Sequence, residues 1–120
     1  MLIDLMTKSE VKTIPFETDY NRWVSRMTSA EIEAIKDVLN AKIDGDEIHT
    51  AGWMPGRDWT GTVYAPIYDK AARQSYDASA KCFGLMVWVV FMERPETWSS
   101  GRFELNGRDI GSRTYFRVHR

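Results

Sequence analysis

The stretch of sequence that decides the fold is residues 82–92, which read CFGLMVWVVFM. These eleven residues carry no charge, although Lys81 precedes them and Glu93 and Arg94 follow them. A helix that crosses a membrane needs about 20 apolar residues, so this run is too short to span one. The run therefore predicts an element that is buried inside the protein.

Two interpretations of this run compete. The β-branched and aromatic residues at 87–91 favour a strand. The flanks favour a helix, because Asp77 can act as an N-cap and Pro95 disfavours helical geometry at Arg94. A segment from 77 to 94 has a normal length for a helix and an unusual length for a strand. We therefore predict a buried central helix over about 77–94, with a buried strand as the alternative.

A helix that is apolar on every side needs other elements around it. Residues 29–43 supply the clearest of these. Thr28 and Glu31 have the spacing of a capping box. The apolar residues that follow share one helical face: Ile32, Ile35, Val38, Leu39 and Ile43. We predict a helix over 29–43 whose apolar face packs on the central run.

Weaker patterns predict the remaining elements. Residues 17–27 and 67–76 are expected to be short helices. Within residues 1–15, Leu2, Ile3 and Leu5 are expected either to form a short strand or to belong to a frayed, flexible end that docks on another element. Short strands are expected at 47–51 and 62–64, and a loop at 98–101. Asn106-Gly107 indicates a hairpin between 102–105 and 108–110, with a further strand at 114–118. Together these elements predict an α+β fold, with a small C-terminal antiparallel sheet.

Composition limits the function. With 120 residues the chain is expected to be a single globular domain over 1–120. The net charge of −1 argues against a dedicated nucleic-acid binder or a basic membrane-surface protein. The single cysteine, Cys82, lies in the apolar run and is expected to be a buried small residue. No motif for a cofactor, a metal ion or a catalytic triad is found, and no secretion signal, so we expect a cytoplasmic protein.

One loop is the first candidate for a ligand or partner site. It combines aromatic faces for stacking, an arginine for an anion and two groups that can transfer protons. Its residues are His49, Trp53, Arg57, Asp58, Trp59 and Tyr64. The alternative is that the two tryptophans fold back onto the core while the charged residues are solvated.

The Arg-rich C-terminal sheet is a second, weaker candidate. Residues 100–120 contain five arginines and two acids, whereas residues 1–50 contain ten acids and six bases. Arginines beside aromatic rings are typical of surfaces that bind single-stranded nucleic acid. The candidate residues are Arg102, Arg108, Arg113, Tyr115 and Arg117. The alternative is a sheet whose arginines form its solvated face.

Self-association is the third possibility. Five Trp, five Tyr, five Phe and six Met are many large side chains for a chain of this size. Such residues are enriched in the cores of protein interfaces, although they can equally pack inside the domain. We therefore expect a non-catalytic interaction module that forms a homodimer, with a protein partner as a further option. A small-ligand binder or small enzyme that uses the first loop, and a nucleic-acid binder that uses the sheet, are the alternatives.

Overall fold

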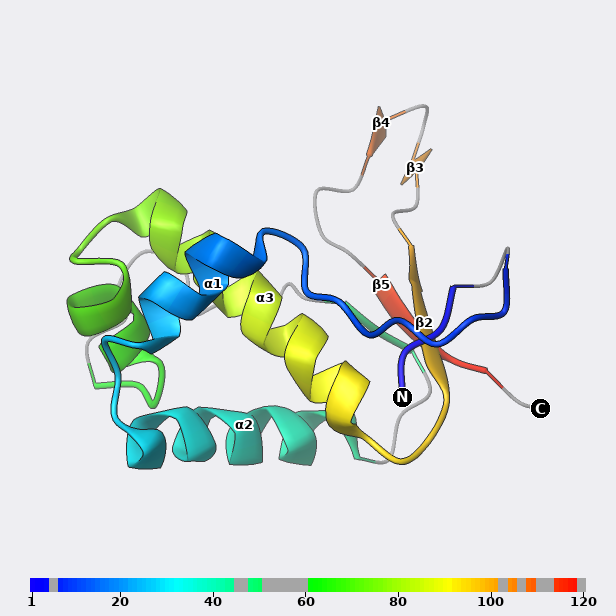
Figure 1. Cartoon of the computed structure of the whole chain (residues 1–120), viewed down its shortest axis with the longest axis horizontal. Helices are drawn as coiled ribbons and strands as arrows, with labels where there is room; N and C mark the ends of the chain where they lie inside the picture. The colour runs from blue at the N-terminus through cyan, green and yellow to red at the C-terminus, as the bar shows by residue number, and fades with distance from the viewer. Residues whose placement is uncertain are drawn as a thin grey trace.

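The computed structural model describes residues 1–4, 7–44, 48–50, 61–101, 104–105, 108–109 and 114–118, with the backbone alone at 48–50, 76, 104–105, 108–109 and 114. The fold is α+β, as predicted (Figure 1). Its helical elements are α1 (Glu17–Val24), α2 (Ser29–Ile43), the single π-helical turn η1 (Ile67–Ala71) and α3 (Tyr76–Glu93). Its strands are β1 (Ile48–Thr50), β2 (Trp98–Gly101), β3 (Glu104–Leu105), β4 (Arg108–Asp109) and β5 (Thr114–Arg117).

The apolar run at 82–92 is helical and lies within α3. The predicted N-cap, Asp77, is wrong by two residues. Ser75 has an extended backbone, and its hydroxyl accepts a hydrogen bond from the backbone N–H of Ala78 at 3.3 Å. Asp77 instead lies inside the first turn, where a negative charge also suits the helix N-terminus. Beyond the other end of α3, Pro95 follows the C-cap residue Arg94.

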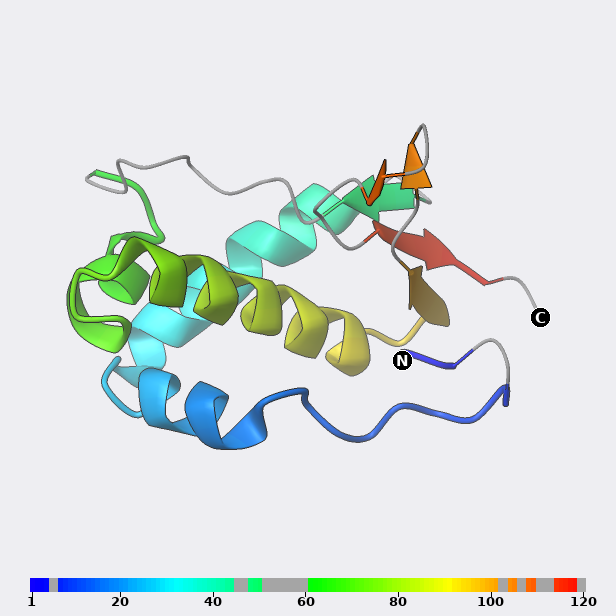
Figure 2. The ribbon, with the colours of Figure 1, turned by 90° about the horizontal axis from the view of Figure 1, so that it is seen from above.

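Helix α3 packs on both α1 and α2 (Figure 2). The side chains of Phe83, Met86, Val87 and Phe91 on α3 are fully buried. Phe91 also contacts the sheet, because its ring stacks on Tyr115 with centroids 4.1 Å apart. The inner side of α3 therefore joins the helical part of the core to the sheet.

Helix α2 confirms the capping box. The Thr28 hydroxyl accepts from the backbone N–H of Glu31 at 3.1 Å, and the Glu31 carboxylate accepts from the backbone N–H of Thr28 at 2.9 Å. Ile35, Leu39 and Ile43 on its apolar face are buried. The helix thus begins where local sequence predicts and packs through the predicted face.

Further local predictions differ from the structure. Residues 98–101, expected as a loop, form β2 and pair antiparallel with β5. Residues 62–64, expected as a strand, form a turn in which the carbonyl of Thr62 accepts from the backbone N–H of Ala65 at 3.1 Å. Helix α1 begins at the expected residue but ends at Val24 rather than at Met27.

The main sheet has the strand order β1-β5-β2, with β5 in the middle and both pairings antiparallel. The N-terminal end of the chain extends this sheet, since Leu2 bridges to Trp98 in parallel and the N–H of Ile3 donates to the carbonyl of Trp98 at 2.8 Å. Strands β3 and β4 form a separate antiparallel pair in which Leu105 faces Arg108, as the predicted hairpin requires. None of the helices within the described ranges is both long enough and apolar enough to cross a membrane.

Candidate functional site

The first predicted site lies mostly outside the described residues. This applies to Trp53, Arg57, Asp58 and Trp59. The backbone of His49 is described and belongs to β1, where it faces Tyr115 of β5. Of the six predicted residues, Tyr64 is the one whose side chain the structure describes.

Tyr64 lies in the core rather than on an open surface. Its side chain is buried, and its ring meets the ring of Phe83 edge-on with centroids 5.0 Å apart. Its hydroxyl is buried and has no hydrogen-bond partner among the residues that the structure describes. Burial also raises the pKa of this hydroxyl, so the group is a neutral donor at physiological pH. An unpaired buried hydroxyl is costly, so within the described part of the predicted site this group is a candidate contact for a ligand.

The second predicted site also lies partly outside the described residues. Arg102 and Arg113 lie outside the described residues, and Arg108 is described by its backbone in β4. Tyr115 is buried against Phe91 and is not available for stacking on a base. The guanidinium carbon of Arg117 lies 5.9 Å from the ring centre of Trp98, and its buried Nε has no hydrogen-bond partner within the described ranges. The described part of this sheet therefore uses its aromatic rings for the core.

Sequence reasoning did not single out Phe16, which is the most unusual surface residue. Its side chain is 77% exposed, and it is the one large hydrophobic side chain exposed to this degree among those the structure describes. Its backbone is left-handed, with φ 52° and ψ 44°, at the N-cap of α1. This conformation costs roughly 1 kcal/mol for a residue with a Cβ atom. Phe is also a poor N-cap residue, and that mismatch is the signal that the sequence contained.

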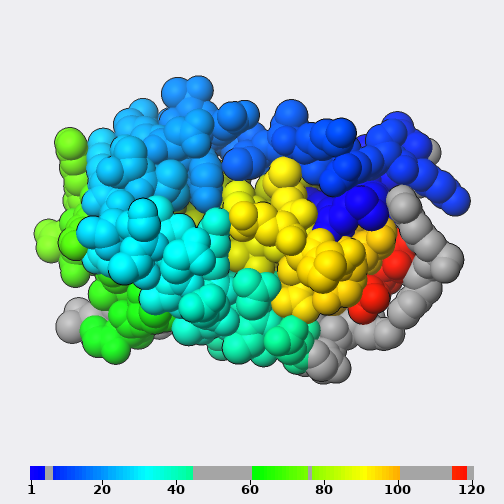
Figure 3. Space-filling view, turned by 60° about the horizontal axis from the view of Figure 1, so that its bottom comes forward, coloured from blue at the N-terminus to red at the C-terminus, as the bar shows by residue number. Residues whose placement is uncertain are grey.

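The outer side of α3 lies beside the segment that contains Phe16. Leu85, Trp88 and Met92 recur at helical spacing on this side and are half-buried, in contrast to the fully buried inner side. We call these three residues the outer strip. The indole Nε1 of Trp88 donates to the backbone carbonyl of Thr13 at 3.2 Å, which ties the N-terminal segment to α3. Figure 3 shows the C-terminal half of α3 reaching the surface between this segment and α2.

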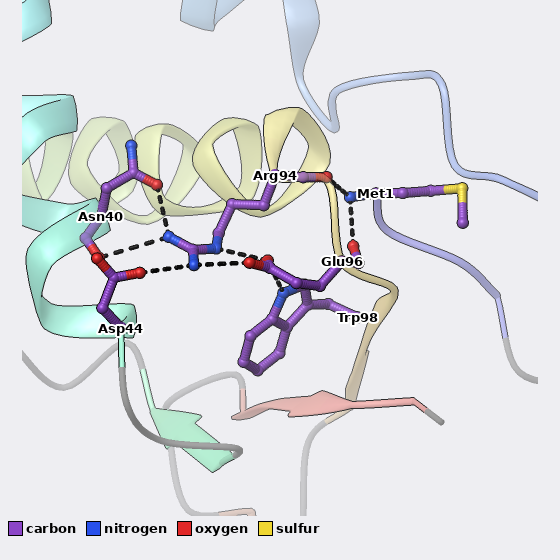
Figure 4. Close-up of polar contacts among 6 residues, drawn as sticks. All are labelled: Met1, Asn40, Asp44, Arg94, Glu96 and Trp98. Atoms are coloured by element: carbon purple, nitrogen blue, oxygen red, sulfur yellow. Dashed lines mark hydrogen bonds and ion pairs between the residues drawn. The ribbon is translucent and has the colours of Figure 1, made fainter. Parts of the chain in front are cut away.

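A polar network fixes the end of α3 beneath this surface (Figure 4). Arg94 donates from Nε and Nη2 to the Glu96 carboxylate at 2.8 and 3.0 Å. It also donates to the carboxylate of Asp44 at 2.7 Å and to the side-chain oxygen of Asn40 at 2.9 Å. The hydrogen bond from Arg94 holds the pKa of Glu96 down at about 2.

The same network anchors the start of the chain. The α-amino group of Met1 donates to the backbone carbonyls of Arg94 and Glu96. The indole N–H of Trp98 donates to the Glu96 carboxylate at 3.1 Å. Because every charged group here has a partner, the network joins α2, α3, β2 and the N-terminus and leaves little room for a ligand.

Nucleophilic and metal-binding chemistry find little support in the described part of the chain. Cys82 is fully buried, and burial raises the pKa of its thiol to about 12, so it is not activated as a nucleophile. Burial, followed by the nearby Cys82 and Glu93, raises the pKa of Tyr20 to about 12. The described residues include no group of three His, Cys, Asp or Glu side chains that could hold a metal ion.

Comparison with known proteins gives no further guide, because the chain matches no family model, no curated protein and no solved structure.

Proposed function

We propose that this protein is a non-catalytic interaction module that self-associates, with Phe16 as its anchor. The observation that carries the proposal is the combination of high exposure and a left-handed backbone at one aromatic residue. The left-handed backbone costs free energy in the isolated chain, and the exposed ring gains none from burial. Unfavourable local choices of this kind concentrate at functional sites, where binding compensates for them.

The surroundings of Phe16 favour a second copy of this chain as the partner. A two-fold interface needs one patch that complements itself. The Phe16 ring of one copy can pack on the outer strip of the other, and the same contact is then made twice. Aromatic side chains are the commonest anchors of such interfaces.

The charges at the border of this patch support the same partner. Glu17 follows Phe16, and Lys12 precedes the carbonyl that binds Trp88. Asp77 and Lys81 are exposed on α3. A border with both signs suits a second copy, which presents the same charges in reverse order, better than a polyanion or an anionic membrane. The cytoplasm remains our proposed location, on the composition argument given above.

The decisive experiment measures mass in solution by light scattering over a wide range of protein concentrations. The wild-type chain is expected to approach twice its monomer mass. Phe16→Gly is expected to remain a monomer at concentrations where the wild type is a dimer. It should also be as stable as the wild type or up to about 1 kcal/mol more stable, because glycine adopts the left-handed conformation freely.

Lys8→Gly is the matched control. Lys8 also has a left-handed backbone, with φ 57°, and is exposed, but it offers no apolar ring. This variant should have the same backbone benefit and leave the mass unchanged. A wild-type chain that is monomeric at every concentration, or a Phe16→Gly variant that dimerises normally, would contradict the proposal.

A small-ligand binder is the second candidate, and the buried unpaired hydroxyl of Tyr64 is the observation that favours it. A thermal-shift screen of small polar molecules on the wild type and on Tyr64→Phe tests it. The variant lacks only the hydroxyl, so it should fold and be stabilised by about 1 kcal/mol without a ligand. A compound that stabilises the wild type but not the variant would support this function, whereas identical responses would remove its basis.

A further inference from the structure

Gly84 has no evident structural role in the middle of α3. Glycine destabilises the interior of a helix relative to alanine, because it loses more backbone freedom on folding. It is useful where another group comes close to the backbone. Within the described residues no such group is present at this position. A Cβ atom built on Gly84 would meet no described atom within 4 Å, its chain neighbours and the backbone of its own helix aside.

Gly84 lies on the outer side of α3, next to the outer strip. Lys81 is one turn before it and Trp88 is one turn after it, and residues three or four apart share one face of a helix. Lys81 is exposed, and Gly84 and Trp88 are half-buried, so this side of the helix reaches the surface. The missing side chain therefore leaves a notch on α3 between Lys81 and Trp88, which we call the Gly84 notch.

An exposed ring from a second molecule suits this notch, because the helix backbone is open to close contact there. We propose that the Gly84 notch receives the Phe16 ring of a second copy of this chain. The inference rests on the proposed self-association and adds the contact that fixes its geometry. In Figures 1 and 2 the start of α1, where Phe16 lies, is beside the middle of α3. One two-fold axis can therefore place each ring in the notch of the other copy.

The charges beside the ring and beside the notch complement each other. Glu17 follows Phe16 directly, and Lys81 borders the notch. Both side chains are exposed, and neither has an ion-pair partner within the part of the chain that the structure describes. Glu17 of one copy can thus meet Lys81 of the other, and the two-fold axis repeats the pair. Lys12 and Asp77 are exposed nearby, so each border carries both signs.

Gly84→Gln tests the notch, because glutamine is a good helix former and fills the gap with a side chain. Light scattering should give a dissociation constant for the dimer at least about tenfold higher than that of the wild type, as expected for an overfilled contact. The fold itself should become more stable. In the Phe16→Gly background, which is expected to be monomeric, adding Gly84→Gln should raise the midpoint of thermal unfolding by about 2–4 °C.

Ala34→Gln is the matched control for the notch, because it adds the same side chain at an exposed small residue of α2. Its dissociation constant should equal that of the wild type. Lys81→Glu and Glu17→Lys test the charge pair, and each should raise the dissociation constant by about three- to tenfold. The double variant carries the reversed pair and should return to within about twofold of the wild type.

The results that contradict this proposal differ from those that contradict the proposed function. A wild-type chain that stays monomeric removes both. If the wild type dimerises and Phe16→Gly does not, but Gly84→Gln behaves like Ala34→Gln, the proposed function stands and the Gly84 notch is overturned. The notch is also overturned if Gly84→Gln destabilises the Phe16→Gly chain, or if the double charge variant associates no better than the single variants.

Discussion

The two sides of α3 are both apolar, but different parts of the chain cover them. Phe83, Val87 and Phe91 on the inner side are fully buried against other helices and the sheet. Leu85 and Trp88 on the outer side are half-buried, and the segment tied to them has no regular secondary structure. An apolar sequence therefore predicts that a helix is buried, whereas the degree of burial on each side of the helix depends on which other segments pack there.

Phe91→Ala should produce the largest loss of stability. The centroid of its ring lies 4.1 Å from that of Tyr115 and 5.0 Å from that of Trp98. Removing the ring therefore leaves a cavity where the helix meets the sheet. We expect the free energy of unfolding in urea to fall by about 3–5 kcal/mol. Phe91→Leu is the control and should cost less than half as much. A loss below about 1 kcal/mol for Phe91→Ala would mean that the inner side is not the main source of stability.

Arg94→Ala should have the next largest effect, because it removes the cation that aligns the end of α3 with α2 and β2. Asp44 and Glu96 would lose their charged partner, and Asn40 a donor. We expect a loss of about 2–3 kcal/mol in urea unfolding. The comparison variant is Lys36→Ala, which breaks a single pair with Glu93 that is more exposed than Arg94–Glu96, and it should cost less than about 1 kcal/mol. Equal losses would show that the Arg94 network is no stronger than a surface ion pair.

The pH dependence of stability should report the same network. Glu96 has a pKa of about 2 in the folded protein, against 4.5 for the group without these contacts. Its stabilising contribution is therefore complete above pH 4.5 and is lost as the pH falls toward about 2. Measured by unfolding across this range, Glu96→Gln should show a weaker loss of stability with acid than the wild type. Glu33→Gln, on the exposed surface of α2, should follow the wild-type curve.

Leu85→Gln should produce a small change in stability, about 1 kcal/mol, because this side chain is already half-exposed. Its effect on self-association should be larger than its effect on folding, since it puts an amide into the outer strip. Light scattering and urea unfolding of the same sample separate the two effects. If Leu85→Gln is as destabilising as Phe91→Ala, the two sides of α3 do not differ as we describe.

The sequence predicted those elements whose signals are local. The capping box at Thr28 begins α2, and the length of the run up to Pro95 identified α3 as a helix. Strand β2 was missed because Trp98-Ser99-Ser100-Gly101 has the composition of a loop. Its strand geometry comes from pairing with β5, which is distant in sequence.

The site was less predictable, because burial of an aromatic residue depends on tertiary packing. Tyr64 and Tyr115 were candidates for a surface and are buried in the core. Phe16 was not among the predicted site residues, but its ring is exposed. Its backbone is left-handed, and no composition or periodicity argument reports that conformation.

The pairing of the first residues with β2 has a consequence for solubility. An open edge strand offers unpaired backbone groups to other chains and promotes aggregation. The N–H of Trp98 donates to the carbonyl of Met1, and the N–H of Ile3 donates to the carbonyl of Trp98, both at 2.8 Å. Residues 1–3 therefore occupy the edge of the sheet at Trp98 and prevent another molecule from pairing with the backbone there. Contacts between copies must then be made by side chains such as Phe16.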